Sequence, residues 1–250
     1  MDNIGSSPIT QTPRMRTMPP ATAAPAASPA PAPPAVSDSG ARQARFWNRF
    51  ARRYAAARMA DPGGYETTLR RVRELLSADQ DVLEIGCGTG TSALRLAPHT
   101  RRLLATDVSP AMIAIAQDKL AAAPVPQLGF AVADAHGPPG EPAAFDAVLA
   151  FNLLQLTGDL DGALAGVVRA LRPGGRLISK TPCVAEMNPL LTHVAIPLLR
   201  AVGLAPPVLC FTGAQLQEAV ARSGLAIEAV ERHGTRGKDI RVFIVARKPG

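Results

Sequence analysis

The stretch Val82-Leu83-Glu84-Ile85-Gly86-Cys87-Gly88-Thr89-Gly90-Thr91 decides how this chain folds. It begins as an apolar strand and passes through three glycines at alternate positions into the start of a helix. Glycines let the backbone turn tightly and bring its amide groups close to a ligand that a Cβ atom would push away. The first N–H groups of the new helix point at the same place. The stretch therefore predicts a ligand site between a strand and a helix.

Two classes of cofactor are bound by loops of this kind. Gly88-Thr89-Gly90-Thr91-Ser92-Ala93 formally satisfies the G-x-G-x-x-G/A pattern of nicotinamide and flavin enzymes. The longer E-x-G-x-G-x-G form, which starts at Glu84, instead resembles motif I of the class I S-adenosylmethionine-dependent methyltransferases. That resemblance implies that the loop surrounds the methionine part of S-adenosylmethionine. The residues it assigns to the cofactor here are Glu84, Gly86, Cys87, Gly88 and Gly90.

The second predicted strand, Arg102 to Asp107, ends in a carboxylate. Asp107 follows Gly90 at the distance where either cofactor class places an acid for ribose hydroxyls. A carboxylate suits a cis-diol because its two oxygens accept two hydrogen bonds. Ser109 and Pro110 already supply the helix-start residues, which favours a ribose role for Asp107 over a capping role. Val108 and Met112 are expected to contact the cofactor beside it.

Three further segments extend the resemblance, in the family's order, over residues 80–181. Phe130 to Ala135 matches the third strand, and the family places an adenine contact at Asp134, next to Ala135. The fourth strand runs into Phe151 and Asn152, at the end that faces the sulfonium in the family. Leu171-Arg172-Pro173-Gly174-Gly175 matches the family's L-[KR]-P-G-G turn.

The tyrosines weigh against a dehydrogenase. Short-chain dehydrogenases need a Tyr-x-x-x-Lys motif after the glycine loop, whereas Tyr54 and Tyr65, the only tyrosines, both precede it. Methyl transfer is therefore favoured over an NAD(P)-dependent oxidoreductase.

The periodicity predicts an α/β fold, with seven strands and helices on both faces of a doubly wound sheet. Helices are expected near 43–58, 64–76, 91–97, 110–122, 159–171 and 213–223, and strands near 80–85, 102–107, 127–132, 145–150, 174–181, 224–231 and 240–247. The resemblance adds a Rossmann-like strand order, 3-2-1-4-5-7-6, with the last strand antiparallel.

Composition divides the chain into a tail and one domain. Residues 1–40 hold 9 of the 24 prolines and few charges, so we expect a disordered Pro/Ala-rich tail. Residues 41–250 then form the catalytic domain, with residues 41–78 as an N-terminal helical cap. The long apolar segment 181–211 exceeds an ordinary connection and is expected to cover the substrate.

The candidate acceptor contacts are Tyr54, Asn152 and His193. Residues 46–55 resemble the start of ubiquinone and menaquinone C-methyltransferases, which implies that Tyr54 lies over the substrate mouth; a core aromatic is the equal alternative. His193 could act as a base, but a lone histidine in an apolar run is more often structural. No catalytic residue is identified, and no metal-ligand cluster is apparent.

The charge of +7 is concentrated in nine arginines between residues 41 and 75. These arginines alternate with aromatics at helical spacing, which favours an amphipathic helix with a core-facing aromatic stripe over a nucleic-acid surface. We therefore expect a small-molecule acceptor and no specific nucleic acid. A nucleic-acid or protein methyltransferase and a binding protein without catalysis remain alternatives. Without an export signal or an apolar run of about 18 residues, a cytoplasmic setting is expected, with peripheral membrane contact still open.

Overall fold

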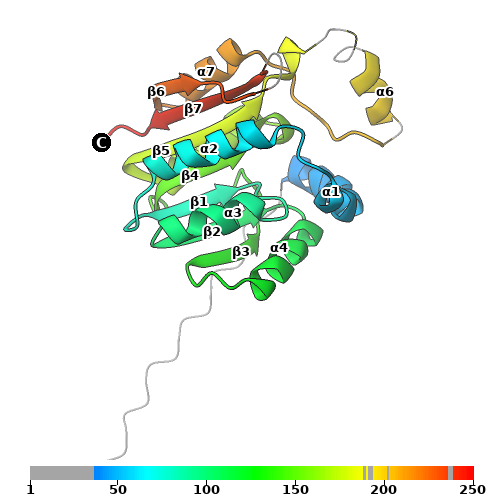
Figure 1. Cartoon of the computed structure of the whole chain (residues 1–250). Helices are drawn as coiled ribbons and strands as arrows, with labels where there is room; N and C mark the ends of the chain where they lie inside the picture. The colour runs from blue at the N-terminus through cyan, green and yellow to red at the C-terminus, as the bar shows by residue number, and fades with distance from the viewer. Residues whose placement is uncertain (1–36, 188–189, 191–193, 202, 236–238) are drawn as a thin grey trace, which may run out of the picture. The chain divides into compact units, whose positions relative to one another are not determined.

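The computed structural model describes residues 37–187, 190, 194–201, 203–235 and 239–250. In this part of the chain one sheet has the strand order β3-β2-β1-β4-β5-β7-β6 (Figure 1). The strands are β1 (Asp81–Ile85), β2 (Arg102–Asp107), β3 (Leu128–Val132), β4 (Phe145–Phe151), β5 (Leu171–Pro182), β6 (Ala226–Glu231) and β7 (Arg241–Arg247). Only β7 is antiparallel to its neighbours, β5 and β6. The predicted order and the antiparallel last strand are confirmed.

Helices cover both faces of the sheet, as predicted. They are α1 (Asp38–Ala56), α2 (Pro62–Leu75), α3 (Thr91–Leu96), α4 (Pro110–Ala122), α5 (Leu160–Ala170), α6 (Ile196–Ala201) and α7 (Gly213–Arg222), with 3-10 turns η1 (Ala97–His99), η2 (Leu154–Leu156) and η3 (Val184–Glu186). One apolar cluster packs Leu164 of α5 and Leu216 of α7 against the sheet. A second packs Leu69 of α2, Leu96 of α3 and Ile113 of α4, and Figure 1 shows α2 and α3 in front of the strands.

The central strand β1 explains this layering. Leu83 and Ile85 belong to the cluster with α5 and α7, while Val82 belongs to the cluster with α2 and α3. Successive side chains of a strand point to opposite faces, so a strand covered on both sides is apolar almost throughout. Two carboxylates are buried on this strand, Asp81 at its first residue, which pairs with arginines, and Glu84 near its carboxyl end. A buried carboxylate in such a strand needs a specific reason, which for Glu84 the site below supplies.

Helix α1 begins earlier than the sequence suggested. Ser37 caps it by accepting a hydrogen bond from the Gly40 amide at 3.0 Å, and the helix starts at Asp38. The expected helix start at residue 43 and the expected tail boundary at residue 40 are therefore wrong, because residues 37–40 belong to the fold. The rest of the expected tail, residues 1–36, lies outside the described residues.

Polar contacts, more than apolar burial, attach α1 to the rest of the fold. Its buried residues are Gly40, Gln43 and Ala51. The expected core-facing aromatics are not buried: Phe46, Trp47 and Phe50 are partly buried and Tyr54 is exposed. The Gln43 amide nitrogen donates to two carbonyls, those of Leu156 and Pro207. The Asn48 side-chain oxygen accepts from Ser109 Oγ at 2.7 Å and from the Ala111 amide at 3.2 Å. The aromatic stripe was thus misassigned to the core, and the helix is held mainly by such contacts.

The segment 181–211 differs from the expected pair of broken helices. Its first residues complete β5, η3 follows, and α6 is the one α-helix with bounds among its described residues. Residues 188–189, 191–193 and 202, and with them His193, lie outside the described residues. In the described part of the chain, no helix has the length and apolar character needed to cross a membrane.

Candidate functional site

A cavity of about 660 Å³ lies at the carboxyl ends of β1, β2, β4 and β5, beneath α1. Its volume is within the range that holds small molecules and cofactors. In open α/β sheets this edge, where the strand order reverses, is the usual ligand site. Of the eleven residues predicted for the cofactor, ten line the cavity: Glu84, Gly86, Cys87, Gly88, Asp107, Val108, Met112, Asp134, Ala135 and Phe151.

The three loop glycines differ in what an added Cβ atom would contact. All three have positive φ, at 64° for Gly86, 55° for Gly88 and 74° for Gly90. A Cβ on Gly86 would clash with Leu153, and a Cβ on Gly90 would lie 2.6 Å from Phe130. A Cβ on Gly88 would meet only the ring of Tyr54, at 3.7 Å. Gly88 therefore faces the open cavity. Gly90, the eleventh predicted residue, is absent from the described lining and instead begins α3.

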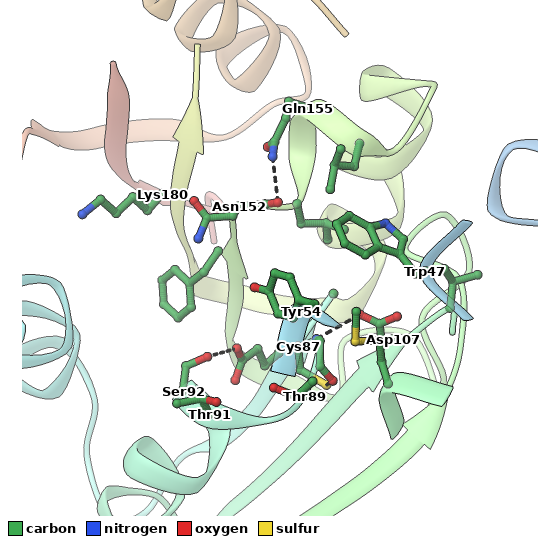
Figure 2. Close-up of a pocket in the computed structure, with 18 of the residues that line it drawn as sticks. Trp47, Tyr54, Cys87, Thr89, Thr91, Ser92, Asp107, Asn152, Gln155 and Lys180 are labelled. Carbon is green, nitrogen blue, oxygen red and sulfur yellow. Dashed lines mark hydrogen bonds between the residues drawn. The ribbon is translucent and has the colours of Figure 1, made fainter. Parts of the chain in front are cut away.

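Glu84 is fully buried in the wall of the cavity. Its Oε1 accepts from Ser92 Oγ at 2.6 Å, the contact dashed in Figure 2, while Oε2 has no hydrogen-bond partner among the described residues. Burial raises the pKa of Glu84 to about 7, the Ser92 hydrogen bond opposes that rise, and the nearby Asp107 carboxylate adds to it. An unpartnered acidic oxygen at this place fits a ligand that brings a cationic donor.

Asp107 is held in place by two backbone amides. Its Oδ2 accepts from the amide of Gly88 and its Oδ1 from the amide of Ser109, both at 2.9 Å. Burial raises the pKa of Asp107, and these two hydrogen bonds oppose the rise. Each oxygen keeps a free lone pair, because a carboxylate offers about four acceptor positions. The side chain is therefore oriented by the glycine loop and retains capacity for a diol.

Asp134 lines the same cavity, but both of its carboxylate oxygens already accept hydrogen bonds from Ser37 and His136. Oδ2 accepts from the Ser37 hydroxyl at 2.6 Å and the Ser37 amide at 2.9 Å. Oδ1 contacts the His136 amide at 3.1 Å and the His136 ring Nδ1 at 2.8 Å. Burial alone would raise the pKa of Asp134, but the hydrogen bonds from Ser37 and His136 hold it below the ordinary range. With about four acceptor positions in use, contact with an adenine amino group requires one of these donors to leave.

Two glutamines contribute acceptors that the sequence reasoning missed. Gln43 on α1 and Gln155 on η2 both line the cavity, and each has a buried side-chain oxygen without a partner in the described part of the chain. The Gln155 nitrogen donates to the Asn152 carbonyl at 2.8 Å, as Figure 2 shows. Buried polar atoms are normally satisfied, so these oxygens also call for donors from a ligand.

Two of the three candidate acceptor residues, Tyr54 and Asn152, line the same cavity. Tyr54 is 50% exposed and lies across the cavity mouth near Cys87, which removes its alternative interpretation as a core aromatic (Figure 2). Asn152 follows β4 with a positive φ of 54°, and its amide donates to the Lys180 carbonyl at 2.8 Å. Of the described residues in the expected cover 181–211, Pro206 lines the cavity.

Lys180 is a further cavity-lining residue that was not predicted from the sequence. It lies near the carboxyl end of β5 beside Asn152 and lines the cavity while being only 6% exposed (Figure 2). A lysine directly after the buried stretch Leu177 to Ser179, in a strand that ends at the ligand edge, was the available signal. Within the described ranges, no group of three or more His, Cys, Asp or Glu side chains is placed to hold a metal ion.

Comparison with known proteins points to methyltransferases, the family that the sequence motifs resemble. A methyltransferase domain family matches residues 82–175. An O-methyltransferase of Aspergillus sclerotiorum is 32% identical over 178 residues, 67% of this chain and 66% of that protein. A ubiquinone/menaquinone biosynthesis C-methyltransferase of Acidiphilium cryptum is 35% identical over 128 residues, 49% of this chain and 51% of that protein. The chain thus spans less than two thirds of the length of these curated relatives.

A solved structure supports the fold. Phosphoethanolamine N-methyltransferase 2 of Haemonchus contortus, in complex with S-adenosyl-L-methionine, superposes with a TM-score of 0.67 at 20% identity and covers 83% of this chain and 60% of its own. With the strand order and the glycine loop, these matches show that the chain belongs to the class I S-adenosylmethionine-dependent methyltransferases, a family of enzymes whose cofactor is S-adenosylmethionine.

Proposed function

We propose that this chain transfers the methyl group of S-adenosylmethionine to a small, partly apolar acceptor. The observation that carries the proposal is one continuous cavity with two unlike ends. One end presents Gly88, Asp107 and the unpartnered oxygen of Glu84. The other end presents Asn152 and Lys180, which Figure 2 shows apart from Asp107, and the exposed side chain of Met59 also lines the cavity.

The residues at the first end match the chemical groups of the cofactor. The Glu84 Oε2 atom suits a cationic amine, because it is an acidic acceptor without a partner among the described residues. Asp107 suits the ribose hydroxyls, since both of its oxygens are fixed by backbone amides and keep a free lone pair. Val108 and Met112 supply apolar surface for the adenine ring. We assign no adenine hydrogen bond to Asp134, because Ser37 and His136 already use its acceptors.

The protein's part in the reaction is positioning. The bound cofactor supplies a methyl group already activated on a sulfonium, so the chain needs chiefly to hold the acceptor atom in line with it. Tyr54 on α1 and Asn152 at the end of β4 both line the cavity and are the residues we expect to contact the acceptor. Met59, which lines the cavity and is largely exposed, supplies apolar surface that favours an acceptor with an apolar body.

Calorimetry and an acceptor screen test this function. The purified chain should bind S-adenosylhomocysteine and S-adenosylmethionine and give no heat with NAD. A panel of phenols, carboxylic acids and amines is then screened for formation of S-adenosylhomocysteine. Binding of NAD with no response to S-adenosylhomocysteine would refute the proposal at its first step.

A further inference from the structure

A continuous line of hydrogen bonds leads from the acceptor end of the cavity to the protein surface. Lys180 Nζ donates to Thr68 Oγ1 at 2.7 Å, and Thr68 Oγ1 lies 3.1 Å from His233 Nδ1. His233 Nε2 lies 2.9 Å from Glu231 Oε2. We call these four residues, Lys180, Thr68, His233 and Glu231, the β5–β6 chain. The cofactor end of the site uses none of them.

Lys180, at the cavity end of the β5–β6 chain, is a buried amine with neutral partners. Besides Thr68 it donates to the Gly64 carbonyl at 3.4 Å, and it forms no ion pair with any described residue. Burial lowers the pKa of Lys180, the Arg241 guanidinium lowers it further, and the carboxylates of Asp239 and Asp61 oppose both. An amine that donates two hydrogen bonds retains one tetrahedral position, which in its neutral form is a lone pair.

The carboxylates nearest to Lys180 are engaged elsewhere. Asp61 accepts from the Gly64 amide and from the Thr235 amide, each at 3.0 Å, and pairs with Arg241 at 3.3 Å. Asp239 pairs with Arg241 at 2.9 Å. Asp239 Oδ2 is buried without a hydrogen-bond partner among the described residues, but neither Asp239 nor Asp61 forms an ion pair with Lys180 in that part of the chain, so the amine is left to the β5–β6 chain and the cavity.

Thr68 can pass a proton because its single hydroxyl hydrogen has two alternative acceptors. Its Oγ1 lies 2.7 Å from the carbonyl of Gly64, one helical turn earlier on α2, and 3.1 Å from His233 Nδ1. The oxygen meanwhile accepts from Lys180. Rotation of the hydroxyl therefore switches its hydrogen between the helix and the imidazole without moving a heavy atom.

His233 is fixed by its outer neighbours. The ring is 7% exposed, packs against Phe243 at 4.5 Å between ring centroids, and presents Nε2 to Glu231. A carboxylate accepts hydrogen bonds, so the neutral ring carries its hydrogen on Nε2 and presents Nδ1 to Thr68 as an acceptor. Glu231 also pairs with Arg71 at 3.0 Å, and its side chain is 29% exposed. The β5–β6 chain thus ends in contact with solvent.

We propose that the β5–β6 chain carries the acceptor's proton out of the cavity, with Lys180 as the group that receives it; this rests on the proposed function. The acceptor loses one proton and gains one methyl group, and the lone pair of Lys180 Nζ takes that proton. The resulting ammonium gives a proton to Thr68 Oγ1 while the Thr68 hydroxyl hydrogen passes to His233 Nδ1. The imidazolium then releases its Nε2 hydrogen through Glu231 to water, which leaves the ring with its hydrogen on Nδ1 and one proton in solvent for the methyl transferred. Before the next turnover the Thr68 hydroxyl rotates back and exchange of the ring hydrogens with water restores the Nε2–H form of His233.

The first test needs no acceptor and no turnover. NMR of the full chain with S-adenosylhomocysteine, labelled at lysine and histidine, follows the ionisation of Lys180 and the ring nitrogens of His233 as pH changes. We expect a neutral Nε2–H ring and a His233 Nδ1 signal that also registers the ionisation of Lys180. Thr68→Val should abolish that second response, and Thr68→Ser should retain it. His136, whose ring contacts Asp134 instead, is the internal control and should not register Lys180.

The second test compares acceptors that need a base with acceptors that do not. Unsubstituted phenol must lose its proton, whereas 4-nitrophenol ionises readily by itself. Lys180→Ala should slow methylation of phenol by about a hundredfold or more, since a positioned base contributes at least that factor. It should change methylation of 4-nitrophenol little, and added methylamine should restore the phenol reaction. Lys248→Met is the matched control, because the Lys248 amine likewise donates to uncharged groups, the carbonyls of Val168 and Leu171, but lies outside the cavity.

The results distinguish failure of the proton-relay proposal from failure of the proposed methyltransferase function. If S-adenosylhomocysteine does not bind, the proposed function fails and the NMR signals of the unliganded chain still report the hydrogen-bond coupling. If the cofactor product binds but Thr68→Val leaves the response of His233 to Lys180 intact, the coupling is only electrostatic and the relay is refuted. Equal losses for phenol and 4-nitrophenol would instead make Lys180 a binding cation. If no phenol is a substrate, the NMR result alone decides.

Discussion

Replacing Glu84 by glutamine should remove a specific dependence of stability on pH. The pKa of Glu84 rises from its ordinary 4.5 to about 7 in the folded chain, chiefly because the side chain is buried. Between these values the folded state holds a proton that the unfolded state has already released. Stability therefore falls as pH rises through this window and stays reduced above it.

The magnitude follows from the two pKa values. They differ by about 2.5, and each unit corresponds to about 1.4 kcal/mol, so the ionised carboxylate costs the unliganded fold about 3 kcal/mol above pH 7. Glutamine has nearly the same shape and still accepts from Ser92, but it does not ionise. The free energy of unfolding of Glu84→Gln, relative to the unchanged protein, should therefore rise by about 3 kcal/mol from acid to neutral pH.

Urea unfolding of both proteins without cofactor, at several pH values between 5 and 8, measures this difference. The matched control is Glu218→Gln, because Glu218 is an exposed carboxylate on α7. Adding S-adenosylhomocysteine should reduce the effect, since a cationic donor at Glu84 Oε2 favours the ionised form. Parallel curves for the unchanged protein and Glu84→Gln across the whole pH range would refute the reasoning.

Three further predictions, tested with five substitutions, concern the cofactor site and the start of α1. Asp107→Ala should weaken binding of S-adenosylhomocysteine by about ten- to a hundredfold in calorimetry. Asp134→Ala should change the affinity less than about threefold, because Ser37 and His136 already occupy the acceptors of Asp134. Equal losses for the two variants would show that both carboxylates contact the cofactor. Gly88→Val should abolish binding, while Gly224→Val, at a positive φ of 89° with nothing within 4 Å of its added Cβ, should retain it; loss in both would point to backbone strain alone. Ser37→Ala should lower the free energy of unfolding by about 1–2 kcal/mol in urea, as loss of a helix cap does, and an unchanged value would show that the α1 cap contributes nothing.

The sequence predicted those parts of the fold that depend on local signals. The helix over 110–122 and the strand over 102–107 were predicted with their observed bounds. Ser109 followed by Pro110 marks the start of that helix, and the apolar run up to Asp107 marks the strand. The strand order came from the family resemblance, since pairing between distant strands leaves no periodic trace in the chain.

The sequence could not reveal features that depend on distant partners. Ser37 belongs to the fold because it meets Asp134, 97 residues later, and nothing in the composition near residue 40 signals that contact. Lys180 and Thr68 are 112 residues apart, and only the packing of α2 against the sheet brings them together. The helix predicted over 159–171 ends at Ala170, and the strand predicted from residue 174 already begins at Leu171. This strand, β5, starts earlier because Leu171 pairs with Phe145 of β4.

The attachment of α1 has a consequence for how the enclosed ligand leaves. Ser37, Gln43 and Asn48 each fix the helix through side-chain hydrogen bonds, while Ala51 is its one fully buried apolar side chain. Releasing these contacts exposes little apolar surface, so the opening should be a small, independent fluctuation with weak sensitivity to denaturant. The hydrogen-exchange rate of the α1 amides should therefore depend little on low concentrations of urea, whereas the amides of β1 and β4 should exchange only through global unfolding. The rate at which α1 opens would then limit turnover, and substitutions at these few polar contacts could change that rate without altering the hydrophobic core.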